Sequence, residues 1–132
     1  MTENEISAQI LDAAITVHKT LGGPGILESY YEAALACELR LRGLKVETQL
    51  DFPVFYKGIR LGIPYRLDMI VEGKVIVECK ATEKHNPIFE AQLLTYLRIT
   101  NLRLGILINF GMIRIIDGFR RIANGIPDNT CN

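Results

Sequence analysis

Hydrophobic residues recur at helical spacing in three segments of the chain. Residues 5–21 carry apolar side chains three or four positions apart, and the turn sequence GGPG at 22–25 ends this segment. The same spacing predicts a second helix over residues 27–42, ended by Gly43, and a third over 87–101, begun by Pro87. The expected inward faces are Ile6, Ile10, Ala13, Ala14, Val17 and Leu21; Tyr31, Ala34, Leu35 and Leu39; and Phe89, Leu93, Tyr96 and Leu97.

Between residues 44 and 80, and again after 102, the apolar spacing changes to every second residue or to short continuous runs. This pattern predicts strands at 44–50, 52–58, 65–71, 74–80 and 103–110, and a final short strand within 112–119. Turns are expected at Lys57-Gly58 and around Glu72-Gly73. The order of elements predicts an α/β (α+β) fold in which helices flank a mixed central sheet, built as one domain over residues 1–132.

The stretch VIVECKATEK at 75–84 places charge directly after a buried strand. Glu78 and Lys80 lie two positions apart, so a strand presents both side chains on one face. Charged residues rarely enter a protein interior unless they are paired or hold a metal ion. The pair is therefore a candidate for chemistry, although E-x-K triplets also arise by chance.

The register of the hairpin decides which residue faces Glu78. Asp68 on the preceding strand faces Val77 if the connection has two residues, and faces Glu78 if the connection is the three residues 72–74. A bulge would give the same facing as the longer connection. We prefer the three-residue connection because it gathers four apolar side chains on the other face: Met69, Val71, Val75 and Val77.

Two carboxylates that face each other across a hairpin repel, and one stays protonated at neutral pH unless a cation lies between them. A hard divalent ion such as Mg²⁺ accepts carboxylate oxygens and retains water for the hydrolysis of a phosphodiester. Lys80 beside such an ion could orient or deprotonate the attacking water. The alternative is a ladder of cross-strand ion pairs without a ligand, formed by Arg66, Asp68, Glu78 and Lys80.

The composition argues against several classes of protein. Fifteen basic and fifteen acidic residues cancel, so the bulk charge gives no support to nucleic-acid binding. Three widely spaced cysteines without a CxxC pair indicate neither a disulfide framework nor a cysteine zinc site. No apolar run reaches the roughly 20 residues that span a bilayer, and the acidic start resembles no secretory signal, so we expect a cytoplasmic location. Five aromatic residues are expected to pack in the core or at its rim rather than stack on bases: Tyr30, Tyr31, Phe52, Phe55 and Tyr56.

Several short motifs resemble those of a known superfamily. Asp68 followed by Glu78-Cys79-Lys80 is similar to the D…(D/E)xK signature of the PD-(D/E)XK nuclease superfamily. Gln92 and Tyr96 resemble the QxxxY motif of its RecB-like branch, and four residues apart they project from one side of a helix. The pattern G-x-x-E-x-x-Y of the GxxExxY family is matched by Gly25, Glu28 and Tyr31. The likeness runs from residue 17 to 111, and it departs where Leu67 precedes Asp68 in place of the common proline.

The resemblance implies a restriction-endonuclease-like fold and a deoxyribonuclease that depends on Mg²⁺ or Mn²⁺. Asp68, Glu78 and Glu28 would bind the metal ion, with the backbone carbonyl of Cys79 as a further ligand and Lys80 as the catalytic lysine. Gln92 and Tyr96 would position the lysine or the DNA backbone, and His18 is a further candidate metal ligand. DNA is the expected partner, and a homodimer or larger complex is compatible with the family. The competing function is a non-catalytic module of the same fold that binds a nucleic acid or a protein within a complex.

Overall fold

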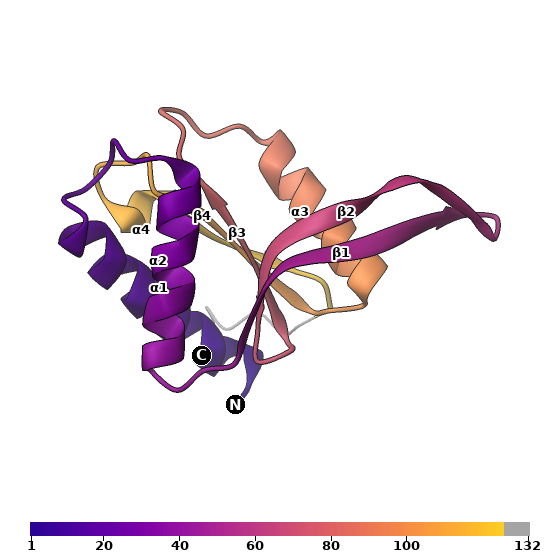
Figure 1. The fold of residues 1–132 in the computed structure, drawn as a ribbon, viewed down its shortest axis with the longest axis horizontal. Coiled ribbons are helices and arrows are strands. Elements are labelled where there is room, and N and C mark those ends of the chain that lie inside the picture. Colours follow the sequence, from indigo (N-terminus) through magenta and orange to yellow (C-terminus); the bar gives the residue numbers. More distant parts are fainter. Residues whose placement is uncertain (126–132) are drawn as a thin grey trace.

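The computed structural model describes residues 1–125, which form a five-stranded sheet flanked by helices. The elements are α1 (Glu3–Thr20), α2 (Glu28–Leu41), β1 (Val46–Tyr56), β2 (Ile59–Val71), β3 (Val75–Lys80), α3 (Ile88–Thr100), β4 (Leu104–Asn109), α4 (Ile115–Gly118) and β5 (Phe119–Ala123). The strands follow the order β1–β2–β3–β4–β5, with β3 and β4 parallel and the other neighbours antiparallel. The predicted fold class, a mixed sheet between helices, is confirmed (Figure 1).

Two apolar clusters hold the layers together. The larger one joins α1 and α2 to one face of β3 and β4, and the smaller one joins α3 to the opposite face through Ile76, Leu93 and Leu97. In β3 the side chains alternate between them, since Val75, Val77 and Cys79 belong to the first cluster. The inward faces of the helices mostly agree with the sequence pattern, although Ala36 is also buried. Four residues predicted to face inward are only partly buried: Leu21, Ala34, Phe89 and Tyr96. None of the helices within residues 1–125 has the length and apolar character needed to cross a bilayer.

The register of the β2–β3 hairpin is the predicted one. Val71 pairs with Val75 and Met69 with Val77, so three residues form the connection. Glu72 and Gly73 adopt the left-handed conformation, with φ of 54° and 65°. The four apolar residues expected together on one face, Met69, Val71, Val75 and Val77, are all fully buried in the larger cluster.

Two predictions about strands are wrong. The segments 44–50 and 52–58, predicted as two strands, belong to one strand, β1. Strand β2 begins at Ile59 rather than at residue 65, because its pairing with β1 continues across an irregularity between Phe52 and Val54. Pro53 is tolerated there because β1 is the edge strand of the sheet. Residues 112–119 hold the short helix α4, and β5 starts only at Phe119. Short apolar runs do not distinguish a helical turn from a strand.

The paired ends of β1 and β2 extend away from the rest of the molecule (Figure 1). The strands turn at Lys57 and Gly58, as predicted, and both residues have positive φ. We call residues 52–65 the hairpin arm. The prediction that aromatic residues pack at or near the core holds for Tyr31 and Phe52, whereas Tyr30, Phe55 and Tyr56 are exposed and the prediction is wrong for them.

Asn109, the buried last residue of β4, fastens the loop that follows β3. Its side-chain carbonyl accepts hydrogen bonds from the backbone N–H groups of Thr82 and Gly111, at 3.0 and 2.9 Å. Its amide group donates to the carbonyl oxygen and the hydroxyl of Thr82, at 3.0 and 3.1 Å. Because Asn109 pairs with Lys80 across the parallel strands, these bonds also fix the end of β3.

We predict that Asn109→Leu lowers the free energy of unfolding by about 2–4 kcal/mol, because backbone groups of Thr82 and Gly111 lose their partners inside the protein. Urea denaturation followed by circular dichroism measures the loss. Thr82→Val serves as the control, since it removes the hydroxyl's bonds with Asn109 and with the carbonyl of Lys84 but leaves the backbone bonds of Asn109, and it is expected to cost less than Asn109→Leu. Equal losses in the two variants would contradict the assigned role of Asn109.

Candidate active site

The candidate site lies where β2 and β3 separate. Their backbone pairing ends at Met69 and Val77. Beyond it, the side chain of Glu78 binds the main chain of Asp68, and the side chain of Asp68 binds the main chain of Cys79. The N–H of Asp68 donates to Oε1 of Glu78 at 3.2 Å, and the N–H of Cys79 donates to Oδ2 of Asp68 at 2.8 Å. Two hydrogen bonds to side chains therefore replace the backbone pairing at this point and hold both carboxylates between the strands. We call this place, formed by Asp68, Glu78 and Cys79, the fork.

The ladder of ion pairs considered as the alternative to a metal site does not form in the described structure. Arg66 pairs with Asp51 of β1 at 3.1 Å instead of facing Lys80, because β2 has already turned away from β3 at that position. Arg66 therefore does not neutralise the carboxylates of the fork, as it would in such a ladder.

Lys80 ends β3 on the face that carries α3. Its Nζ lies over the ring of Phe89 at 4.6 Å from the ring centroid, which is a favourable cation–π position. Its backbone carbonyl accepts the N–H of Phe110 at 2.8 Å. The ring and the strand end thus restrict the amine, and its charge acts on the pKa values of Asp68, Glu78 and Glu28.

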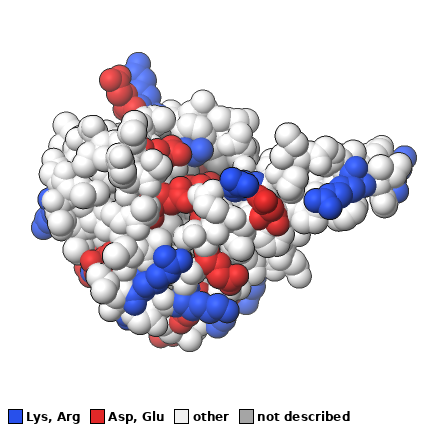
Figure 2. Space-filling model, in the orientation of Figure 1, with Lys and Arg blue, Asp and Glu red and all other residues white. Residues whose placement is uncertain are grey.

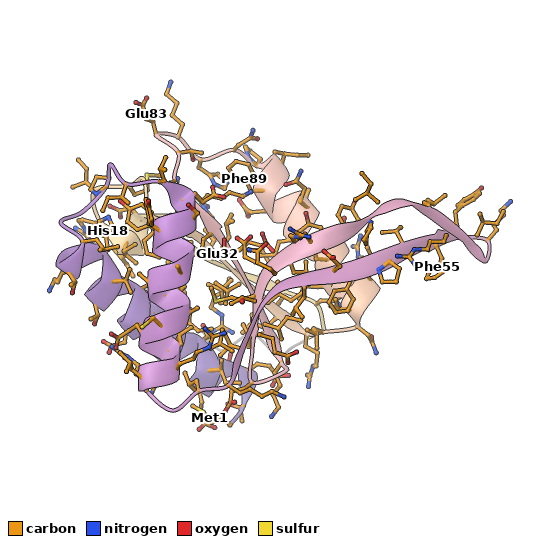
Figure 3. All side chains as sticks on the ribbon, in the orientation of Figure 1. Met1, His18, Glu32, Phe55, Glu83 and Phe89 are labelled. Atoms are coloured by element: carbon orange, nitrogen blue, oxygen red, sulfur yellow. The ribbon has the colours of Figure 1, made fainter. Side chains whose placement is uncertain are left out.

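Helix α2 brings two further carboxylates to the fork. Glu28, its first residue, is exposed, yet desolvation of its carboxyl group raises its pKa, with Asp68 adding to the effect and Lys80 opposing it. Glu32, one turn later, is partly buried and accepts a hydrogen bond from the amide of Gln49. Burial raises the pKa of Glu32, and the charges of Asp68 and Glu28 raise it further. Figure 2 shows acidic side chains gathered beside α2, where the hairpin arm leaves the body, and Figure 3 shows Glu32 facing this region.

Tyr31 fixes the direction in which α2 presents these acids. Its ring is fully buried and stacks on Phe110 with centroids 4.7 Å apart and planes 8° apart. Its hydroxyl donates to the carbonyl of Gly23 at 2.7 Å and accepts the N–H of Ile26 at 3.2 Å. The tyrosine of the G-x-x-E-x-x-Y pattern is therefore an anchor between the turn before α2 and the end of β4, with Glu28 one helical turn away.

The two residues predicted on α3 differ in their surroundings. Tyr96 is partly buried and packs edge-on against Tyr65 of the arm, with centroids 4.9 Å apart. Burial raises the pKa of its hydroxyl, and the charge of Glu78 raises it further, so Tyr96 borders the fork. Gln92 lies one turn earlier on the same helix and is exposed.

His18 stands apart from the carboxylates. Its ring is buried beside Phe110, with centroids 6.3 Å apart, and it lines a pocket formed with Ile15, Lys19 and residues 113–116. Figure 3 shows His18 near α4 and Glu32 near the strands. The structure thus does not bring His18 into the fork.

The carboxyl group of Glu78 has a strongly raised pKa. Burial raises its pKa to about 8, and the nearby charge of Asp68 adds to the shift. The pKa of Asp68 is also raised by burial, although the N–H of Cys79 opposes this. At neutral pH the pair therefore tends to keep a proton, as expected for adjacent carboxylates without a cation.

The donor set fits a hard divalent cation. Asp68, Glu78, Glu28 and Glu32 offer carboxylate oxygens, the ligand type that Mg²⁺ and Mn²⁺ prefer, and their raised pKa values are of the kind that a cation would lower. Within residues 1–125 no three His, Cys, Asp or Glu side chains are grouped tightly enough to hold an ion by themselves. The carboxylates thus border the fork from α2, β2 and β3 without a closed three-ligand group.

Glu32 is the residue that sequence reasoning missed. It follows Glu28 by four positions, so both acids project from the same side of α2. This spacing indicates that Glu32 accompanies Glu28, whereas the G-x-x-E-x-x-Y pattern includes only Glu28.

Glu78 makes the stability of the metal-free protein depend on pH. A carboxyl group whose folded pKa is raised from 4.5 to about 8 stabilises the fold fully below pH 4.5, and this contribution is lost as the pH rises to 8. We predict that, in EDTA, the free energy of unfolding from Glu78 falls by a few kcal/mol between pH 5 and 8. Urea titrations of Glu78→Gln should show a flatter pH dependence. An identical slope in wild type and variant would contradict the assignment.

Comparison with known proteins agrees with this geometry. A family model described as the PD-(D/E)XK nuclease superfamily matches residues 4–122. The crystal structure of SSO0001 aligns with a TM-score of 0.50 at 17% sequence identity, covering 92% of this chain and 79% of that one, and at this identity it supports the fold alone. No curated protein matches the chain. Since the family model spans all nine elements up to β5, with a helix-flanked sheet of the restriction-endonuclease-like kind, the chain belongs to the PD-(D/E)XK nuclease superfamily.

Proposed function

We propose that the protein is a nuclease that uses Mg²⁺ or Mn²⁺ to hydrolyse phosphodiester bonds of DNA. The observation that carries the proposal is the convergence of Asp68, Glu78 and Lys80 at the fork, with Glu28 of α2 beside them, in a chain of a nuclease superfamily. We further propose that it belongs to the GxxExxY family of the RecB-like branch, on the motifs described above, and that residues 1–132 act as one domain.

Each side chain has a role that its surroundings support. Asp68 and Glu78 would hold the cation, with the carbonyl of Cys79 and the carboxylates of Glu28 and Glu32 completing or orienting its shell. The cation, when bound, would polarise the phosphate and lower the pKa of a coordinated water. Lys80, restrained over Phe89, would hold the water or the phosphate oxygen at the open side of the fork. Tyr96 and Gln92 would position the DNA backbone or the lysine from α3.

A non-catalytic module remains the second candidate function. Two observations favour it: the acids of residues 1–125 form no closed three-ligand group, and the hairpin arm exposes apolar side chains far from the fork. This alternative predicts no cleavage by the purified chain under any metal condition.

Metal binding is predicted to stabilise the protein through the fork. A ligand at 100 times its Kd adds about 2.7 kcal/mol to the free energy of unfolding, so saturating Mn²⁺ should raise the melting temperature measurably. The gain should be larger at pH 8 than at pH 6, because binding must displace the proton held by Glu78. Calorimetry of Asp68→Asn and Glu78→Gln should show loss of the effect, while Glu83→Gln, an exposed acid after β3, retains it. Equal Mn²⁺ stabilisation of all four proteins would contradict the site.

Cleavage tests the activity itself. Linear, circular and single-stranded DNA are incubated with Mn²⁺ and, separately, with EDTA. We expect cation-dependent cleavage that Glu78→Gln and Lys80→Ala each reduce by about 100-fold or more, with melting curves that show both variants folded. Lys84→Ala is the matched control, because this exposed lysine lies four residues beyond Lys80. Cleavage that survives both site substitutions, or that proceeds in EDTA, would refute the proposal.

A further inference from the structure

The hairpin arm carries an unusual share of the exposed apolar surface. Six of the fourteen exposed large hydrophobic residues of the described chain lie between residues 55 and 65, and Ile63, at 92% exposed, is the most accessible of them. Isolated apolar side chains are common on protein surfaces, but a contiguous patch marks an interaction site. The arm therefore needs a partner that its own fold does not provide.

Cross-strand pairing sorts the side chains of the arm onto two faces. Residues directly opposite each other in an antiparallel ladder point to the same side. One face consists of three apolar pairs, Phe52 with Tyr65, Val54 with Leu61, and Tyr56 with Ile59. The other face carries the pairs Asp51 with Arg66 and Phe55 with Arg60. We call the six apolar residues the apolar arm face.

The apolar arm face continues the core beneath α3. Phe52 packs against the smaller apolar cluster, and Tyr65 contacts Tyr96 of α3. Arg60 and the Arg66–Asp51 ion pair lie on the opposite side, away from α3. Figure 2 shows Lys and Arg side chains along the visible side of the arm, while Figure 1 shows α3 passing behind the arm's base. Charge is thus segregated from the apolar side chains except at the tip, where Nζ of Lys57 lies over the ring of Tyr56 at 5.4 Å from its centroid.

We propose that the apolar arm face is a dimer interface in which the arms of two copies of this chain pack face to face. A two-fold axis brings the same residues together from both copies. The face has one cation, Lys57 at its tip over the ring of Tyr56, so two copies can meet along the rest of it without burying an unpaired ion. A nucleic acid would instead need cations along the contacting face to neutralise its phosphates, and Arg60 lies on the other side.

The size of the face sets the expected strength of the dimer. Tyr56, Ile59, Leu61 and Tyr65 are 58%, 67%, 46% and 39% exposed. With about 200 Å² for an aromatic side chain, the four would bury on the order of 400 Å² per copy. The total of about 800 Å², to which Phe52, Val54 and Ile63 add, lies below the roughly 1,200 Å² at which stable specific interfaces begin and in the range of weak, transient ones. We therefore expect a weak, reversible dimer that dissociates on dilution.

Sedimentation equilibrium between 1 and 200 µM, in EDTA and without DNA, tests the interface independently of nuclease activity. Wild type should be a reversible dimer. Tyr56→Glu with Leu61→Glu should raise the Kd at least 100-fold and leave a monomer. The matched control is Phe55→Glu with Arg60→Glu on the opposite face of the arm, where Phe55 is 60% exposed, close to the value of Tyr56. This control should remain dimeric, and circular dichroism should show both variants folded.

Three results would overturn the proposal. The first is a wild-type protein that stays monomeric at 200 µM. The second is equal weakening of the dimer by both pairs of substitutions, or by neither. The third is a dimer unaffected by Tyr56→Glu with Leu61→Glu while binding of a duplex oligonucleotide, measured by fluorescence anisotropy, is lost; this would assign the face to nucleic acid.

Discussion

The separation of β2 from β3 after only three residue pairs is the constraint on which the candidate site depends. A longer ladder in the same register would have paired Asp68 with Glu78. Instead, each acid accepts a backbone N–H of the opposite strand, so the fork satisfies its main-chain donors with carboxylate oxygens. Hydrogen bonding thereby keeps two acidic side chains close together. Burial raises the pKa values of both, and the charge of Asp68 raises that of Glu78 further.

Structural residues around the fork serve to keep this arrangement in place. Asn109 fixes the loop after Lys80 through its bonds to Thr82 and Gly111, and Tyr31 docks α2 on Phe110 at the end of the neighbouring strand. A motif such as G-x-x-E-x-x-Y then has a physical meaning: the tyrosine positions the helix and the glutamate reaches the site. The same separation of strands frees β2 to continue with β1 as the hairpin arm, so the site and the arm have a common origin.

Much of the fold followed from the sequence because strand alternation and helix spacing agree with burial there. The register at 72–74 was predictable since only one pairing gathers Met69, Val71, Val75 and Val77 on one face. The extent of the hairpin arm was not predictable from the sequence. Apolar and polar residues continue to alternate there although no core lies beneath them, and the two strands of the arm are held only by each other. The helical turn at 115–118 was missed because four residues carry no period. Assigning Glu32 to the site requires the orientation of α2, because only tertiary packing determines that the side carrying Glu28 and Glu32 faces Asp68.

The central claim is that Asp68 and Glu78 share a buried fork whose electrostatics favour a bound cation. Carboxyl-carbon NMR of selectively labelled glutamate, recorded against pH in the absence of metal, measures it most directly. We predict that Glu78 titrates near pH 8 and that Asp68→Asn lowers this value, because the charge of Asp68 contributes to the shift. A Glu78 signal that titrates near pH 4.5, unaffected by Asp68→Asn, would contradict it.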